Sequence, residues 1–171
     1  MSDAEVSELL EAQRTVILAT LGPRGWPHLM PLWYVLRASP HDRRRARGGA
    51  APAREPSPRV WAWTYAASQK VRNLERDPRA TLLVEAGESY EQLRGVMLEC
   101  EVVVHRDVDT VAALGREIFR RYAAPRGQEP VAELHAEVAA MVDRQAAKRV
   151  GLEFIERGRA SWDHAKLGGT Y

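Results

Sequence analysis

The chain has 171 residues, of which 45% are hydrophobic and 28% charged, and its formal net charge is +2. This composition is typical of a soluble globular protein with one good core, and so small a charge argues against nucleic acid as a partner. No apolar run approaches the ~20 residues of a membrane-spanning helix, so we expect no membrane partner. The acidic N-terminus and the single cysteine, Cys100, predict a cytoplasmic protein.

The first elements are predicted to be a capped helix and two strands. The sequence SDAE at 2–5 forms a capping box ahead of apolar residues at helical spacing. Residues 15–21 form a β-branched strand, and after a glycine turn residues 26–37 form a second. Pro27 and Pro31 in that second strand cannot donate to a neighbouring strand. We therefore expect it to lie at an edge, to be bulged, or to face something other than a strand.

Residues 39–58 break this pattern. They are rich in arginine, proline and glycine with almost no apolar side chain, which predicts a flexible insertion. The segment is either a variable exposed loop or an electrostatic lid for an anionic ligand tail.

The stretch that follows carries most of the functional signal. A third strand places Trp61, Trp63 and Tyr65 on one face and gives way to a short helix, which Pro78 ends. Ser68 stands at the N-cap of this helix.

Lys70 and Arg72 lie in the first turn of the same helix. Free backbone N–H groups, a hydroxyl and an ammonium group together suit an anion. A cofactor phosphate is one hypothesis for that anion, and a capped surface helix with solvated cations is the alternative.

The rest of the chain predicts more strands and a helical pair. These are strands at 79–85, 93–105 and 148–157, and helices at 107–123 and 129–147. Cys100 falls on the apolar face of its strand, and Glu99 and Glu101 fall on the solvent face. Six or seven antiparallel strands, with a helix after the third, predict a mainly β fold: one barrel domain over 1–171 with peripheral helices.

Several catalytic motifs are absent from the sequence. It contains no glycine-rich nucleotide loop and no serine nucleophile motif, and its histidines lack the spacing of a zinc site, so no metal is expected. If the protein is an enzyme, a bound cofactor should supply the chemistry, and no catalytic side chain can be named.

Motifs in the correct order resemble the pyridoxamine 5'-phosphate oxidase-like family of split β-barrel flavin and deazaflavin proteins. They are the hairpin VILATLGPRGWPHLMPLWYV, the run T-x-x-x-S-x-K from Thr64 to Lys70 followed by RNL and DP, LLV at 82–84, and RGV at 94–96. The resemblance covers residues 10–105. The tail WDHAKLGG is similar to the C-terminal segment of the subgroup that uses the deazaflavin coenzyme F-420.

The resemblance implies an antiparallel split β-barrel and a homodimer with two cofactor sites between the subunits. Ser68 and Lys70 would hold the cofactor phosphate, backbone at 30–33 would face its ring system, and Trp162 would approach from the partner. The implied cofactor-binding residues are Met30, Pro31, Leu32, Trp33, Trp63, Thr64, Ser68, Lys70, Arg72 and Trp162.

Three departures from the family pattern bear on the cofactor. His28 and Trp33 replace an arginine and a lysine, and Gly95 replaces a glutamine, which argues against the vitamin B6 reaction and against tight FMN binding. The acidic tail of coenzyme F-420 could instead use Arg72, Arg76 and the arginine-rich insertion. The first hypothesis is therefore an F-420-dependent reductase that transfers hydride to an unknown small conjugated substrate. An FMN-dependent oxidase or reductase, and a non-catalytic cofactor- or haem-binding protein, are the alternatives.

Overall fold

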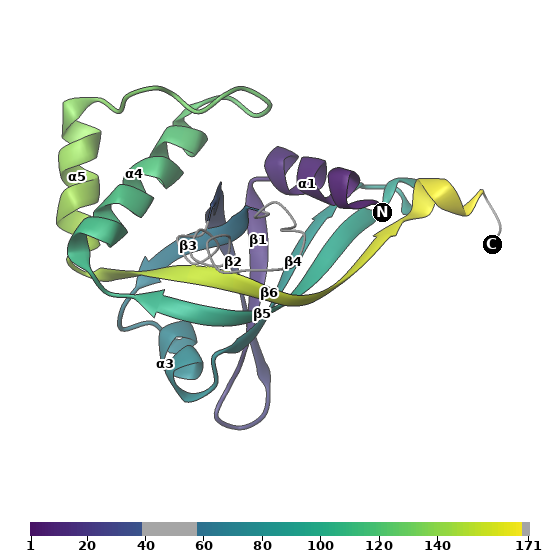
Figure 1. Ribbon diagram of the computed structural model, residues 1–171, viewed down its shortest axis with the longest axis horizontal. Helices are drawn as coiled ribbons and strands as arrows, with labels where there is room; N and C mark the ends of the chain where they lie inside the picture. The colour runs from purple at the N-terminus through teal and green to yellow at the C-terminus, as the bar shows by residue number, and fades with distance from the viewer. Residues whose placement is uncertain (39–57, 169–171) are drawn as a thin grey trace, which may run out of the picture.

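The computed structural model describes residues 1–38 and 58–168. Six antiparallel strands close into a barrel in the order β1-β2-β3-β6-β5-β4 (Figure 1). The strands are β1 (Thr15–Leu21), β2 (Pro27–Arg37), β3 (Arg59–Tyr65), β4 (Arg79–Ala86), β5 (Arg94–His105) and β6 (Arg149–Asp163). The helices within the described ranges are α1 (Asp3–Ala12), α3 (Gln69–Arg76), α4 (Val108–Ala123) and α5 (Ala136–Ala146), with short 3-10 helices η1 (Tyr90–Gln92) and η2 (His164–Leu167). The predicted mainly β barrel, with a helix after the third strand, is confirmed.

The barrel interior is filled by alternate residues of its strands, such as Val16 of β1 and Leu82 of β4, both 0% exposed. Burial of each such side chain contributes about 1.5–3 kcal/mol. Apolar residues of α1 and α3 join the same core, and the two helices lie at opposite ends of the barrel (Figure 1). The predicted capping box begins α1, because Ser2 Oγ accepts from the N–H of Glu5 and Glu5 accepts from that of Ser2.

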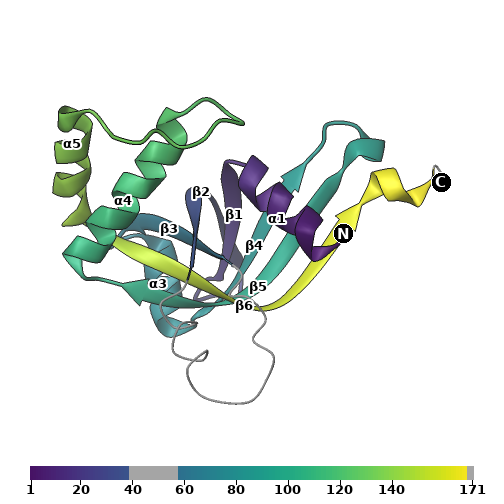
Figure 2. The same ribbon diagram turned by 45° about the horizontal axis from the view of Figure 1, so that its top comes forward.

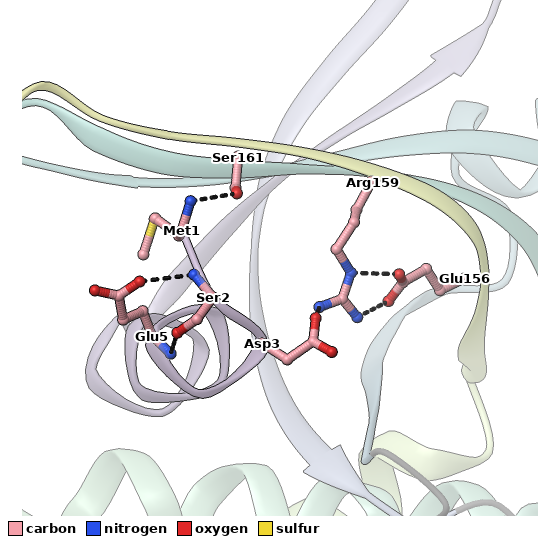
Figure 3. A network of polar contacts seen from close by, with 7 residues as sticks. All are labelled: Met1, Ser2, Asp3, Glu5, Glu156, Arg159 and Ser161. Atoms are coloured by element: carbon pink, nitrogen blue, oxygen red, sulfur yellow. Dashed lines mark hydrogen bonds and ion pairs between the residues drawn. The ribbon is translucent and has the colours of Figure 1, made fainter. Parts of the chain in front are cut away.

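Polar contacts hold α1 against the far end of β6 (Figure 3). The amine of Met1 donates to Ser161 Oγ at 3.2 Å. Arg159 binds Asp3 at 3.2 Å and Glu156 at 2.5 Å, so one guanidinium links the helix to the strand. The end of β6 is thereby fixed at the side of the barrel away from α4 and α5 (Figure 2).

A second core lies outside the barrel, where α4 and α5 cover β3. Trp61 and Trp63 share a face as predicted, but they pack against apolar residues of these helices and are 3% and 8% exposed. A side chain at Gly115 of α4 would overlap the Trp63 ring, so glycine permits the close approach. Tyr65, on the same face, is 50% exposed. β3 is therefore buried on both faces over most of its length.

Two predicted boundaries were wrong. α5 begins at Ala136 rather than at 129, because the preceding connection contains Pro130 and a glycine at positive φ, Gly127 (φ 80°), neither of which favours a helix. β6 continues to Asp163 rather than ending at 157, since it pairs with β5 beyond a register shift at Glu99/Cys100. The insertion predicted at 39–58 lies outside the described residues apart from Pro58. No helix in the described part of the chain is long and apolar enough to cross a membrane.

Candidate functional site

The first half of β2 is paired on one side only. It pairs with β1 from Pro27 to Trp33, whereas β3 pairs with it only from Tyr34 onward. Pro31 lies opposite Ile17 of β1, in the part of β2 that β3 does not reach. Of the three possibilities expected for this strand, the structure shows an edge along this half, where β1 is the only strand of the described residues that pairs with it.

A polar corner lies where β3 passes into α3. Ser68 occupies the predicted N-cap position, with extended backbone angles (φ −73°, ψ 153°). Its side chain makes no cap hydrogen bond, and Ser68 Oγ is buried without a partner among the described residues. A buried hydroxyl without a partner costs free energy, so this atom favours the binding of a polar group at the start of α3.

Lys70 follows Ser68 by two residues, in the first turn of α3, and is 7% exposed. Its Nζ donates to Thr64 Oγ1 at 3.1 Å, and no carboxylate of the described residues forms an ion pair with it. Burial lowers the pKa of Lys70, and the nearby charge of Arg149 lowers that pKa further. The structure thus joins Lys70 to Thr64 and leaves a buried, partnerless hydroxyl two residues away at Ser68, and a buried cation without a counterion in the described residues is suited to an anion.

Arg149 is a residue near this corner that the sequence analysis missed. It begins β6, and its guanidinium lies between the rings of Trp63 and Tyr65, at 4.3 and 4.1 Å from their centroids. The nearest signal in the sequence was its place at the start of a predicted strand. The pairing of Tyr65 with Arg149 places the guanidinium on the outer face of β3, opposite to the face from which Thr64 binds Lys70.

Other predicted site residues lie apart from these three. Trp63 is adjacent to Thr64 in β3, so its side chain projects to the opposite face, where its ring meets the edge of Phe119 of α4. Arg72 is exposed on α3 without a polar partner in the described ranges. Arg76 donates to the backbone carbonyl of Leu21.

The other predicted residues lie in strands β2 and β6 rather than at the junction of β3 and α3. Met30 and Trp33 are 39% and 47% exposed, and Trp33 stacks on Tyr122 of α4 at 4.2 Å. Pro31 is exposed and Leu32 half-buried between them. Trp162 lies opposite Gly95, where any side chain would overlap the tryptophan ring. The glycine that departs from the family pattern therefore makes room for Trp162.

A buried carboxylate forms a separate cluster on the outer face of the barrel. Glu153 is 0% exposed and binds Arg59 at 2.7 Å and His105 at 3.0 Å, while His105 stacks on Trp61. Because two basic groups compensate the carboxylate, we assign the cluster a packing role.

A cleft of about 870 Å³ separates α1 from the connection between α4 and α5. Glutamates line it together with Arg14, Arg120 and Arg121. Arg14 and Arg121 already donate hydrogen bonds to backbone carbonyls. The remaining lining has both acidic and basic side chains, so it does not favour one class of ligand.

Comparison with known proteins gives the family. Residues 2–147 match the family model described as pyridoxamine 5'-phosphate oxidase. The chain belongs to the pyridoxamine 5'-phosphate oxidase family. The chain is similar to the solved structure of a conserved hypothetical protein from Mycobacterium tuberculosis. The two are 34% identical, with a TM-score of 0.74, and the match covers 100% of this chain and 90% of that chain.

More distant structures share the family's fold. An F420 reductase is 19% identical, with a TM-score of 0.57 over 90% of this chain and 94% of that one. The haem storage protein HutZ from Vibrio cholerae is 13% identical, with a TM-score of 0.60 over 92% of each chain. Identities this low show the fold alone. No curated protein matches the chain.

Proposed function

We propose that this protein is an oxidoreductase dependent on the deazaflavin coenzyme F-420, which transfers hydride to a small conjugated substrate. The observation that carries the proposal is the buried Lys70 ammonium, which has no carboxylate partner in the described structure, beside the partnerless Ser68 hydroxyl at the start of α3. A phosphate would give Lys70 a negative partner and Ser68 a hydrogen-bond acceptor, and the free N–H groups at a helix N-terminus also favour an anion. Family membership supports a phosphate-bearing redox cofactor at this corner, and an F420 reductase shows that the same fold can serve a deazaflavin enzyme.

Each residue of the corner has a defined task in this proposal. Lys70 binds the phosphate by charge and is held in place by Thr64, while Ser68 donates its hydroxyl hydrogen. The reduced deazaflavin, when bound, supplies the hydride. The unpaired edge of β2 at 30–33 offers backbone groups to a flat ring, and Met30 and Trp33 shield that edge from water. No side chain has to act as a strong base, because positioning of donor and acceptor is the main contribution of the protein.

FMN is the second candidate, because its phosphate would fit the same corner. The site favours the deazaflavin at one position. Family members that hold FMN tightly are expected to offer a glutamine where this chain has Gly95, and here the Trp162 ring covers that glycine. No side chain from position 95 can therefore reach a ring system.

We also propose that the protein is a homodimer with its cofactor sites at the seam. The outer face of β1, β2, β4 and β5 carries a row of apolar side chains, Ile17, Leu29, Leu83 and Met97. Leu29 is 56% exposed, and the others are half-buried. Contiguous apolar surface of this kind is typical of an interface. A second copy packed on it would also meet Trp162, which lies on the same face as its neighbour Gly95.

Titration of the purified protein with each cofactor tests the function. We expect F-420 to bind more tightly than FMN, and the reduced F-420 to be oxidised by at least one acceptor of a conjugated-substrate panel. Binding of FMN alone would overturn the choice of cofactor. Tight binding without turnover across the panel would instead indicate a carrier or haem-type binding protein.

A further inference from the structure

A row of aromatic side chains crosses the outer face of the sheet where β3 ceases to pair with β2. Trp33 of β2 and Trp63 of β3 both make edge contacts with the ring of Phe119, at centroid distances of 6.2 and 6.1 Å. The Arg149 guanidinium then joins Trp63 to Tyr65. We call Trp33, Phe119, Trp63 and Tyr65 the aromatic row. Each ring contacts the next one, either directly or through Arg149.

The two ends of the aromatic row are open to solvent. Trp33 is 47% exposed and Tyr65 is 50% exposed, whereas Trp63 between them is 8% exposed. One side of the Trp33 ring stacks on Tyr122 at 4.2 Å, with 15° between the two planes. A large ring that is fixed on one side and exposed on the other is preorganised to stack on a flat ligand.

Arg149 brings an unpaired charge to this row. Its polar contact among the described residues is a long one, from Nε to Gln145 Oε1 at 3.4 Å, and its terminal nitrogens have no acceptor there. The side chain is only partly exposed. A guanidinium with free terminal nitrogens matches a carboxylate, which it can bind through two parallel hydrogen bonds. The row therefore combines apolar rings with a position for one carboxylate.

The two faces of β3 separate this charge from Lys70. Lys70 binds Thr64 on the inner face, whereas Arg149 lies on the outer face. A ligand of the aromatic row is therefore distinct from the phosphate proposed at Lys70. Trp33, at the far end of the row, belongs to the half of β2 that β3 leaves unpaired, against which the cofactor ring is proposed to lie. A molecule bound along the row would be next to that ring.

We infer that the hydride acceptor is an elongated conjugated acid, whose ring system lies against Trp33 and whose carboxylate binds Arg149. The inference rests on the proposed function for the role of acceptor, and it adds the class of substrate. Because Phe119 and Trp63 lie between these two residues, the acceptor has to be longer than a single ring. Arg149 fixes one end of it and Trp33 the other, which orients the conjugated bonds beside the cofactor.

The experiment measures the binding of two probes of the same shape, 4-phenylcinnamate and its neutral amide, to the full chain without cofactor by calorimetry. We expect the acid to bind about tenfold more tightly than the amide, because hydrogen bonds between two charged groups are the stronger ones. Arg149→Gln should abolish this preference and leave the affinity for the amide within about twofold. Arg149→Lys should keep part of the preference, because it keeps the charge.

Two further variants separate the tasks of the rings and the charge. Trp33→Leu should weaken both probes by a similar factor, because both lose the same stacking surface, so the ratio of their affinities should stay as in the native protein. Arg157→Gln is the matched control, since Arg157 lies on the same strand as Arg149 but is paired with Glu101. It should leave both affinities unchanged.

Equal affinities of the native protein for the acid and the amide would overturn the inference, and this measurement does not require any variant to fold. A preference for the acid that persists in Arg149→Gln would overturn it too. If Arg149 only braces β3 against β6, its loss should lower stability and weaken both probes alike. A native dimer that binds neither probe, and that Trp33→Leu converts into a monomer, would assign the row to the subunit interface instead.

Binding of F-420 is measured separately. Its absence would overturn the proposed function, whereas an acid preference that depends on Arg149 would still support the binding site for an aromatic acid.

Discussion

Replacement of Lys70 by methionine should separate the affinity of the site from the stability of the protein. The lysine is 7% exposed, and burial lowers its pKa from 10.5, so the folded protein disfavours its charge. Methionine keeps an apolar stem of similar length and removes the ammonium group. Removal of the disfavoured charge should raise the stability of the folded protein, and loss of the hydrogen bond to Thr64 should lower it. We expect the free energy of unfolding of the cofactor-free protein to change by no more than about 1 kcal/mol.

Binding should change much more than stability. A hydrogen bond to a charged group contributes about 1.5–3 kcal/mol, so the affinity of Lys70→Met for F-420 should fall roughly 10- to 150-fold. Arg72→Gln is the matched comparison, because Arg72 lies in the same helical turn but is exposed. An exposed charge contributes at most about 1 kcal/mol, which is roughly a fivefold change.

Fluorescence titration at fixed ionic strength measures the affinities, and urea denaturation of the cofactor-free protein measures stability. Unchanged affinity in Lys70→Met would remove Lys70 from the site. A loss of several kcal/mol of stability with little change in affinity would show that the ammonium supports the fold instead. Equal losses of affinity in both variants would contradict the argument from burial.

Three further predictions concern pH, packing and assembly. Folding lowers the pKa of Lys70, so the ammonium form is disfavoured in the folded protein. As the pH rises toward 10.5, the lysine loses its proton, so the affinity for the cofactor should fall and the stability of the cofactor-free protein should rise. Lys70→Met should show neither change in an alkaline titration series. Gly95→Ala should displace Trp162 and cost about 1–3 kcal/mol of stability, and an unaltered tryptophan emission and melting temperature would contradict this. Leu29→Glu should convert a dimer into a monomer in light scattering, whereas a native protein that is already monomeric would refute the proposed seam.

Elements that depend on a short stretch of sequence were predicted correctly. The capping box at Ser2 and the β-branched run at 15–21 each specify one element, and α1 and β1 have those positions. Alternation along 93–105 put Cys100 in the core, where it is 4% exposed and burial raises the pKa of its thiol to about 12. Glu99 and Glu101 are exposed on the opposite face, as predicted.

Features that depend on the register of distant strands were not predictable from the sequence. The aromatic face of β3 is covered by α4, which begins at Val108, 45 residues after Trp63 in the sequence. Arg149 lies over the rings of Trp63 and Tyr65 only because β6 pairs with β3. The helix predicted at 129–147 begins only at Ala136, because the spacing of apolar residues alone does not show where the helix starts after Pro130.

Lys70 and Arg149 are positioned by the same strand, and this explains why β3 is buried on two faces. Thr64 projects to the inner face and holds Lys70, while Trp63 and Tyr65 project to the outer face and enclose Arg149. Trp63 is itself fixed by α4, so the helical cover limits the freedom of the guanidinium. The helices α4 and α5 therefore fix the outer face of β3 through their packing, on the far side of the strand from Lys70.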